Sequence, residues 1–336
     1  MKNSLSEMSP DNNLSIQIGF FDNGKQFQRY LEEIFPNLPA NTRKALASDW
    51  RVYCKFCAQN GYQPIHADHE IMGKTILAFV DSQATELKHN TISRRITSLK
   101  TIFQAMNVNN PLVTDLIVKK SVRLKINQVA KPAGQAKPLM WKTINEHIAT
   151  LDLDDLLSLR TAVILRLAFD TMCRASELAQ IKFEHITRRA NGNGSVLIEK
   201  SKTDKTAIGS YRFVDTNTLK LIDLWSARTG LKRGLILRPI NGKSRNVYPS
   251  SKQRDSKPVN YSTILSAFKS VGYDENFTAH STRVGSALEQ IQAKISSQKI
   301  QIAGGWKSPH MIAYYGRQLD DQSSGSAELA QKRYIP

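Results

Sequence analysis

The segment at residues 128–138, QVAKPAGQAKP, divides this chain into two parts that we expect to fold as separate domains. It carries two prolines and a glycine, and proline can neither donate a backbone hydrogen bond nor continue a helix. On both sides of it, apolar residues recur mainly at the spacing of an amphipathic helix. We therefore predict a flexible arm over residues 1–20, a helical domain over 21–127, a linker over 128–138 and a second domain over 139–336.

Two basic amphipathic helices are predicted in the first domain. The first begins at Asn41-Thr42, with Thr42 as its N-cap, and ends at Gly61. The second covers about residues 90–104. Their apolar stripes repeat at helical spacing and consist of Leu46, Trp50, Tyr53, Cys54, Cys57, Ile92, Ile96, Leu99 and Phe103. Their remaining surfaces carry cations: Arg43, Lys44, Arg51, Lys55, Lys88, Arg94, Arg95 and Lys100.

The charge balance of the chain favours a polyanionic partner. There are 47 Lys and Arg against 29 Asp and Glu, a formal net charge of +18, which attracts nucleic acid or an anionic membrane. A single basic helix face is usually only a solvated surface, but two of them in so basic a chain favour contact with DNA. No acidic residue lies between Asp115 and Glu146, and such a stretch suits a phosphate backbone. We expect a helical DNA-binding domain whose DNA-facing residues include Arg43, Lys44, Arg94 and Arg95.

Membrane association is not expected. No window approaches the roughly 20 apolar residues that span a bilayer. The first twenty residues are polar and lack the apolar stretch of a secretory signal. Three cysteines in this length argue against a disulfide framework. We therefore expect a cytoplasmic protein.

The second domain is predicted to be mainly helical, with a small antiparallel sheet. Helical spacing extends to about Arg189, is broken at residues 194–215, and resumes to the C-terminus. SVLIE (195–199) and SYRFV (210–214) have the β-branched and aromatic content of two strands, with a lysine-rich turn between them. The predicted fold class is therefore mainly α.

Three short patterns resemble nucleotide or metal sites but have simpler explanations. The GKT at 73–75 resembles the end of a P-loop, yet Asp68 occupies the position of the required upstream glycine, so a helix is predicted there. Cys54 and Cys57 lie on the core stripe, without a second Cys or His pair at zinc-finger spacing. His66 and His69 have no evident third ligand and indicate a surface position. We expect neither a cofactor nor a metal.

Four segments of the second domain carry residue types that suit phosphoryl transfer. They are MCRASEL (172–178), SKT (201–203), HSTRVG (280–285) and GGW (304–306), the last followed nine residues later by Tyr315. Each has an ordinary explanation when it is taken alone. Arg174 and Glu177 have the spacing of a surface ion pair, Lys202 would be solvated at a turn, and a helical tyrosine usually packs in a core.

Taken in order, these residues resemble the active-site signature of the tyrosine recombinases. The signature residues here are Arg174, Lys202, His280, Arg283, Trp306 and Tyr315. The resemblance is clearest from about residue 160 to residue 320. The segments HSTRVG, AGGW and YYGRQLD make it strongest to the Cre-like subgroup. Met172 and Trp306 stand where many members have glycine and histidine. Spacing selects Tyr315 rather than Tyr314, and Lys202 rather than Lys200 or Lys205.

The resemblance implies a fold and a reaction. The fold is a helical core-DNA-binding domain and a mostly helical catalytic domain that clamp DNA as a C shape. Arg174 and Arg283 would hold the non-bridging phosphate oxygens through their planar charged groups, and Trp306 would donate its indole N–H. Tyr315 would attack phosphorus, giving a 3′-phosphotyrosine and a free 5′-hydroxyl. This covalent step retains the bond energy for rejoining, so ATP is not required.

Proton transfer and local charge are assigned to three further residues. A phenol has an ordinary pKa of about 10, so a nearby acceptor helps, and His280 is that acceptor. Glu177 would support the site electrostatically and orient its partners, and Lys202 would protonate the leaving 5′-oxygen as general acid. The arginines and the lysine supply the positive charge that a two-metal site would otherwise provide.

The resemblance also implies partners. Strand exchange in this family requires a homotetramer on two DNA sites, each protomer binding half of an inverted repeat. A short helical pattern around residues 327–331 is the candidate for a C-terminal helix that packs into a neighbouring protomer. A bacterial, phage or plasmid-encoded recombinase is therefore expected. The alternatives are a type IB-like topoisomerase, which would relax DNA at many sites, and a DNA-binding regulator that does not cleave.

Overall fold

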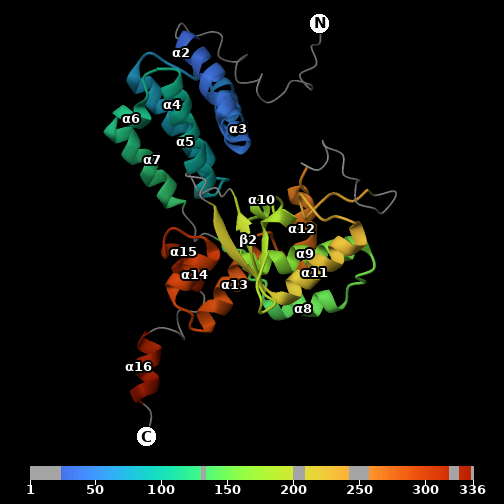
Figure 1. The fold of residues 1–336 in the computed structure, drawn as a ribbon. Helices are drawn as coiled ribbons and strands as arrows, with labels where there is room; N and C mark the ends of the chain where they lie inside the picture. Colours follow the sequence, from blue (N-terminus) through green and yellow to red (C-terminus); the bar gives the residue numbers. More distant parts are fainter. Residues whose placement is uncertain (1–23, 130–133, 200–208, 242–256, 318–324, 334–336) are drawn as a thin grey trace. The chain divides into compact units, whose positions relative to one another are not determined.

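The computed structural model describes residues 24–129, 134–199, 209–241, 257–317 and 325–333. The chain divides into two compact units, residues 1–133 and 134–336 (Figure 1). The predicted arm at residues 1–20 and part of the predicted linker lie outside the described residues.

The first unit is entirely helical in its described part. Its elements are α2 (Gly24–Arg29), a π-helical turn (Tyr30–Ile34), a 3₁₀ turn (Phe35–Asn37), α3 (Ala40–Gln59), α4 (His69–Ala84), α5 (His89–Ala105), α6 (Pro111–Thr114) and α7 (Leu116–Gln128). Aromatic side chains form the centre of its core. The ring of Tyr53 meets Phe79 and Phe103 edge-on, with centroids 5.2 and 5.9 Å apart. These geometries are favourable for aromatic pairs, so α3, α4 and α5 form one packed layer.

The predicted helices α3 and α5 are present, with small differences. Leu46, Trp50, Tyr53 and Cys57 are buried as predicted, while Cys54 is only half-buried. The expected N-cap Thr42 is wrong, because α3 begins at Ala40 with Pro39 in the capping position. The carbonyl of Pro39 accepts from the N–H groups of Thr42 and Arg43. Proline is well tolerated at the start of a helix, because the N–H groups there have no partner within the helix and proline has no N–H.

The GKT at 73–75 lies inside α4, as predicted, and not in a phosphate-binding loop. Asp68, the residue that replaced the required glycine, caps this helix by accepting from the backbone N–H groups of Glu70 and Ile71. Within the described residues, no helix is long and apolar enough to cross a membrane.

The second unit is mainly helical, with a three-stranded sheet. Its elements are α8 (Trp141–Ala149), α9 (Leu156–Thr171), α10 (Ala175–Leu178), a 3₁₀ turn (Phe183–His185), β1 (Ile186–Arg188), β2 (Gly194–Ile198), β3 (Ser210–Val214), α11 (Thr216–Thr229), α12 (Tyr261–Lys269), a 3₁₀ turn (Tyr273–Glu275), α13 (Ser281–Gln292), α14 (Ser297–Gly304), α15 (His310–Gly316) and α16 (Gly325–Arg333). The mainly α fold class with a small antiparallel sheet is confirmed.

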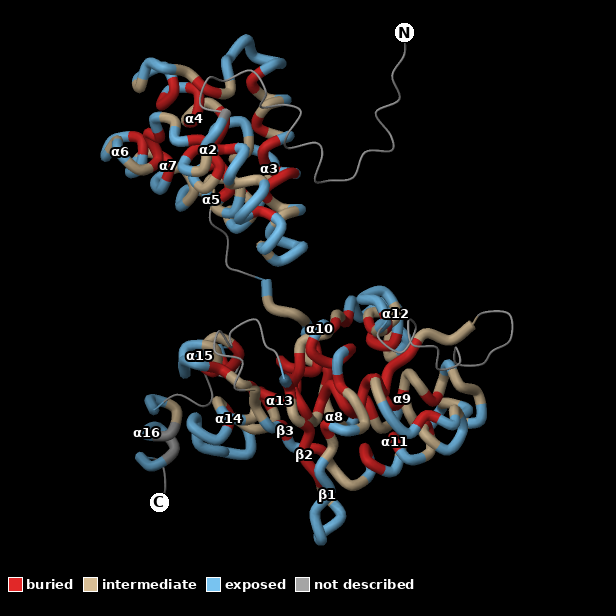
Figure 2. Tube along the Cα trace, turned by 45° about the horizontal axis from the view of Figure 1, so that its top comes forward, coloured by how far each residue is buried: buried red, intermediate tan, exposed pale blue. Residues whose placement is uncertain are grey.

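Helix α9 is the central element of this unit. Apolar residues surround almost its whole circumference, as expected for a helix buried on all sides. It packs against α8, α11, α12, α13 and β3, and the buried residues in Figure 2 concentrate around these elements. A second, smaller apolar cluster contains Met172, Trp306 and Tyr315. Trp306 and Tyr315, two of the candidate catalytic residues, therefore lie in a packed apolar cluster.

The sheet differs from the sequence prediction by one strand. Its order is β1-β2-β3 and both pairings are antiparallel, with Val196 opposite Ile186 on one side and Arg212 on the other. The extension of helical structure to Arg189 is wrong, because a 3₁₀ turn and β1 occupy residues 183–188. Three residues are too few to show the alternating pattern of a strand. The expected return of helix after the sheet is also interrupted, since the described residues between α11 and α12 are not helical.

Candidate active site and nucleic-acid interface

Four segments that are distant in sequence meet in the second unit. Arg174 lies at the N-cap of α10, directly after the end of α9. His280 occupies the N-cap position of α13, and Arg283 lies one turn into that helix. Trp306 follows the end of α14, and Tyr315 lies in α15. Because α13 contacts α9, α14 and α15, it brings these side chains to one place.

Tyr315 and His280 form the central contact of this site. The Tyr315 hydroxyl lies 2.9 Å from Nε2 of His280, and the tyrosine is only 2% exposed. Burial raises the pKa of Tyr315, whereas Arg283, by its charge and a hydrogen bond, and then Arg174 act in the opposite direction. Although His280 as a whole residue is exposed, desolvation and the charges of Arg283 and Arg174 lower its pKa to about 4. The imidazole is therefore neutral near pH 7 and, protonated at Nδ1, can accept the phenolic proton.

Arg283, in α13, hydrogen-bonds to the end of α9 and to the turn after α14. Only 2% of the residue is exposed, and burial lowers its pKa. Its guanidinium donates to the carbonyl of Met172 and to that of Gly304, the second over 3.3 Å. Its charged carbon also lies 5.5 Å from the centre of the Trp306 ring, within the range of a cation–π contact. Arg283 thus fixes the base of the site as well as contributing charge to it.

The backbone at Met172 explains one departure from the family pattern. This residue ends α9 in the left-handed conformation, with φ 49° and ψ 29°. Glycine adopts that conformation without strain, which accounts for the glycine that many tyrosine recombinases have here. In this chain the methionine side chain is fully buried in the cluster under Tyr315. Apolar packing of the side chain offsets the local strain, and the Met172 carbonyl is directed to Arg283.

Glu177 orients Arg174. One carboxylate oxygen of Glu177 accepts from Nη1 of Arg174 over 2.8 Å, and the other accepts the backbone N–H of Arg174 over 2.9 Å. The Glu177 side chain is 7% exposed, whereas that of Arg174 is 28% exposed. The carboxylate therefore holds the guanidinium from the protein side while part of the arginine faces solvent. This is the arrangement that an anionic ligand requires.

Trp306 packs directly on the candidate nucleophile. Its ring centre lies 5.3 Å from that of Tyr315, at an angle of 47°. The adjacent Tyr314 contacts Tyr315 edge-on, and the Arg317 guanidinium lies 4.3 Å from the centre of the Tyr314 ring. Tyr315, the tyrosine that the sequence spacing selects, is the one whose hydroxyl contacts Nε2 of His280.

Lys202, the sequence-predicted general acid, lies outside the described residues. The strands on either side of it are described, and Ile198 of β2 pairs with Ser210 of β3. Beyond Ile198, Glu199 binds Nζ of Lys182 over 3.1 Å and Nε2 of His185 over 3.3 Å. The end of β2 that leads toward Lys202 is therefore held to the 3₁₀ turn that precedes β1.

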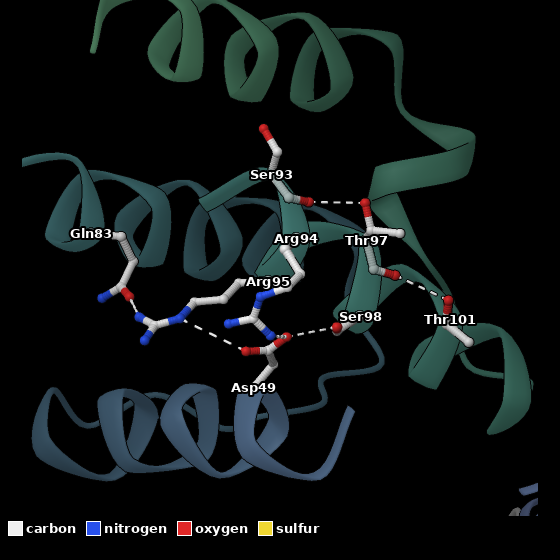
Figure 3. Close-up of polar contacts among 8 residues, drawn as sticks. All are labelled: Asp49, Gln83, Ser93, Arg94, Arg95, Thr97, Ser98 and Thr101. Atoms are coloured by element: carbon white, nitrogen blue, oxygen red, sulfur yellow. Dashed lines mark hydrogen bonds and ion pairs between the residues drawn. The ribbon is translucent and has the colours of Figure 1, made fainter. Parts of the chain in front are cut away.

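The predicted DNA-facing arginines of α5 converge on a buried carboxylate of α3 (Figure 3). Asp49 is 1% exposed, and its Oδ2 accepts from Arg94 and from the Ser98 hydroxyl, the latter over 2.7 Å. Arg95 lies with its Nε 3.9 Å from the other carboxylate oxygen and donates to the side chain of Gln83. The side chain of Arg94 is 46% exposed and that of Arg95 only 17%. Arg94 therefore remains available to a ligand, whereas Arg95 is largely internal.

The other two predicted DNA-facing residues lie near the start of α3. Lys44 is exposed and Arg43 is half-buried. All four cations belong to the first unit, and the candidate catalytic residues belong to the second.

Sequence reasoning missed two buried charged residues, Asp49 and Arg212. Asp49 occupies a position within the apolar stripe of α3, between Leu46 and Trp50, and a lone acidic residue on such a stripe is a usable signal. Arg212 of β3 is only 9% exposed, while its neighbours Tyr211 and Phe213 point outward and are 64% and 48% exposed. Residue type alone predicts the opposite pattern of burial, because aromatic side chains usually lie on the inner face of a strand and charged ones on the outer face.

The sequence and the fold of this chain are both similar to those of known integrases and recombinases. Residues 137–322 match the model of the phage integrase family. The chain is 26% identical over 290 residues to an integrase/recombinase xerD homolog of Selenomonas ruminantium, covering 82% of this chain and 81% of the relative. It is 23% identical over 306 residues to recombinase cre of Escherichia phage P1, covering 86% and 87%. Its fold is similar to that of a XerH site-specific recombinase bound to a palindromic difH substrate, with a TM-score of 0.59, 15% identity, and coverage of 87% and 79%.

Proposed function

This chain belongs to the phage integrase family, and from that membership we infer that it is a site-specific DNA recombinase whose nucleophile is Tyr315. It is an enzyme that cleaves and exchanges DNA strands. The observation that carries the assignment of the nucleophile is the 2.9 Å contact between the Tyr315 hydroxyl and His280, beside two arginines. A phenol next to a neutral imidazole and fixed positive charge has what attack on an anionic phosphodiester requires.

We propose the following cleavage step. The Tyr315 oxygen attacks phosphorus while its proton passes to Nε2 of His280. Arg174 and Arg283 stabilise the charge that develops on the non-bridging oxygens, and Trp306 adds an indole N–H. The bond from phosphorus to the 5′-oxygen breaks, and Lys202 protonates that oxygen. The products are a 3′-phosphotyrosine and a free 5′-hydroxyl, and attack by another 5′-hydroxyl reverses the step without ATP or a metal ion.

The experiment that tests this function is the recovery of covalent adducts. Protein is mixed with nicked DNA fragments from its source replicon, denatured with SDS, and the DNA still attached to protein is sequenced. We expect the recovered ends to converge on one inverted repeat. Ends scattered without sequence preference would instead favour a topoisomerase, and no adduct under conditions of proven DNA binding would favour a regulator that does not cleave.

We propose that α5 reads bases through Arg94. The exposed side of this helix near Arg94 carries hydroxyl groups (Figure 3). Those of Thr97 and Thr101 donate to helix carbonyls over 2.9 and 3.0 Å, so their oxygens remain acceptors at the surface. Asp49 fixes one edge of the Arg94 guanidinium, which lowers the entropy lost when another edge binds a ligand. An arginine held in this way is suited to paired hydrogen bonds with guanine in the major groove.

The other cations of this unit have different proposed roles. Lys44 is exposed and is suited to a phosphate contact, and we assign the same contact to Arg43. Burial lowers the pKa of Arg95, although the charge of Asp49 acts in the opposite direction. Arg95 therefore acts on DNA indirectly, by helping to hold the carboxylate that orients Arg94.

Replacing Arg94 with lysine should relax sequence preference rather than abolish binding. Lysine keeps the charge but lacks the planar fork, so discrimination at one base pair in each half-site should fall by about 1–3 kcal/mol. Selection of binding sites from a randomised DNA pool measures this. Asp49→Asn should reduce the base preference at the same position of the half-site. Lys100→Gln, a change at an exposed lysine of the same helix, should instead weaken binding to all sequences alike. An unchanged preference in Arg94→Lys would contradict the base-reading role.

For assembly, we propose a homotetramer on two DNA sites, each protomer binding half of an inverted repeat. The XerH neighbour is described with a palindromic substrate, which supports such a target. Helix α16 covers Gly325–Arg333, and Leu329 within it is 49% exposed. We propose that this helix packs against a neighbouring protomer in the assembly.

A further inference from the structure

Arg212 makes a contact that links the sheet to the active-site helices. It lies on β3, is 9% exposed, and donates from Nη1 to the carbonyl of Ile302 over 2.9 Å. Ile302 belongs to the last turn of α14, at the negative end of the helix dipole, and its carbonyl also accepts from the backbone N–H of Gly305 over 3.2 Å. The guanidinium of Arg212 thus acts as a side-chain cap that is supplied by a different element.

The turn after α14 is shaped to receive this guanidinium. Gly305 has φ 62°, a conformation that L side chains rarely adopt. A Cβ at Gly305 would lie 1.7 Å from Nη2 of Arg212 and 2.7 Å from its Cζ, so any other residue would collide with the arginine. The guanidinium of Arg212 therefore occupies the space that a side chain at residue 305 would need.

This turn carries groups that the proposed reaction uses. The carbonyl of Gly304 accepts from Arg283, and the N–H of Trp306 donates to the carbonyl of Gln301. Trp306 in turn packs on Tyr315. Two arginines from different elements therefore hold one turn, Arg283 from α13 and Arg212 from β3. A shift of the turn would move Trp306 and the nucleophile beside it.

The cost of burying Arg212 argues against a role in stability alone. Its guanidinium bonds a carbonyl rather than a carboxylate, and burial lowers its pKa. Cys173 and Glu177 act to raise the pKa of Arg212, and a smaller repulsion from Arg174 acts to lower it. A buried charge of this kind is expensive, and an apolar side chain of similar volume often costs less. Its presence is therefore better explained by the geometry it imposes.

We propose that Arg212 is a positioning residue for strand cleavage, which anchors the Gly304–Trp306 turn to β3 and so holds Trp306 and Tyr315 in place for attack. The proposal rests on the recombinase function given above. It concerns the arrangement of the nucleophile and not the binding of DNA, because the arginine points into the protein toward Ile302.

The test compares Arg212→Met with Arg188→Met. Arg188 lies on β1 of the same sheet, pairs with Asp223 and is 51% exposed, so its replacement removes the same charge without touching the turn. With saturating nicked DNA, Arg212→Met should cleave on the order of 10²-fold more slowly in a single turnover, because displacement of a reacting group by about 1 Å has an effect of this size. Its affinity for DNA should stay within about twofold of wild type, and Arg188→Met should cleave at the normal rate.

Further measurements separate positioning from other roles. A 5′-bridging phosphorothiolate substrate, which needs no acid, should not restore cleavage by Arg212→Met, since the defect lies in the attack. Arg212→Lys keeps one donor for Ile302 and should recover part of the rate, and it serves as the test if the methionine variant does not fold. Gly305→Ala should slow cleavage more in the wild-type background than in Arg212→Ala, because the collision with the arginine is then removed and only the backbone strain at φ 62° remains.

Three results would overturn the proposal. Normal cleavage by Arg212→Met would exclude a positioning role. A loss of DNA affinity as large as the loss of rate would indicate a direct phosphate contact instead. Recovery on the phosphorothiolate substrate would indicate a role in leaving-group protonation. If wild-type protein itself formed no adduct, the recombinase assignment would fail first, and that outcome is distinct from all three.

Discussion

Tyr315→Phe is expected to form no covalent DNA adduct while binding target DNA with unchanged affinity. The substitution removes only the hydroxyl, which is the atom that lies 2.9 Å from Nε2 of His280. The ring can keep its contacts with Trp306 and Tyr314. Loss of one hydrogen bond should change the free energy of unfolding by only about 1 kcal/mol, so the variant should remain folded. Gel analysis after SDS treatment, with a nicked substrate that prevents rejoining, measures the adduct.

The adjacent tyrosine provides a matched control for this variant. Tyr314→Phe removes the same atom one residue earlier, from a ring that packs under Arg317. It should form adducts at close to the wild-type rate. An adduct formed by Tyr315→Phe, or an equal loss in Tyr314→Phe, would remove Tyr315 as the nucleophile. A filter-binding or mobility-shift assay of both variants confirms that the difference lies in the chemistry and not in DNA binding.

Most of the candidate site residues could be predicted because four local motifs, taken in order, resemble the tyrosine recombinase signature. Arg174, His280, Arg283, Trp306 and Tyr315 were selected from local motifs, and the structure brings them together. What the motifs could not give is the contact between His280 and Tyr315, which depends on how α13 and α15 pack. Lys202 was chosen on spacing and on its position in the predicted hairpin, and it lies outside the described residues.

The errors in the fold have separate local causes. Helical spacing was easily recognised where a helix has one apolar stripe, as in α3 and α5. It was misleading at residues 183–188, where the segment is a 3₁₀ turn and a three-residue strand that is short and mostly exposed. The helix start at Ala40 was missed because Pro39 caps through its carbonyl and has no capping side chain.

The two missed charged residues are both buried where an apolar side chain is the usual choice. Asp49 lies on the core stripe of α3, and Arg212 on the inner face of β3. In each case the partner is remote in sequence, Arg94 for the first and Ile302 for the second. Sequence periodicity identifies which positions are inside, but it does not identify which distant group will meet a buried charge there. Such residues become apparent only when the elements have been placed.

Arg174→Gln should reduce the single-turnover cleavage rate by about 10²- to 10³-fold, the usual effect of losing one donor to a developing negative charge. The guanidinium is oriented by Glu177 from the protein side and is partly exposed on the other. The backbone bond from residue 174 to Glu177 does not depend on the side chain, so α10 should keep its N-terminal cap. Arg174→Lys should also cleave slowly, although it retains the charge, because lysine lacks the fork that matches two phosphate oxygens.

A matched control distinguishes this effect from a general loss of positive charge. Arg228 is 46% exposed in α11 and pairs with Asp154, so Arg228→Gln makes the same chemical change away from the site. Cleavage on nicked DNA at saturating concentration should be near normal in this control and slow in both Arg174 variants. If Arg174→Lys cleaved as fast as wild type, a point charge would be sufficient at this position. The role of Glu177 in fixing the plane of the guanidinium would then be contradicted, and the geometry of the site would have to be explained by Arg283 alone.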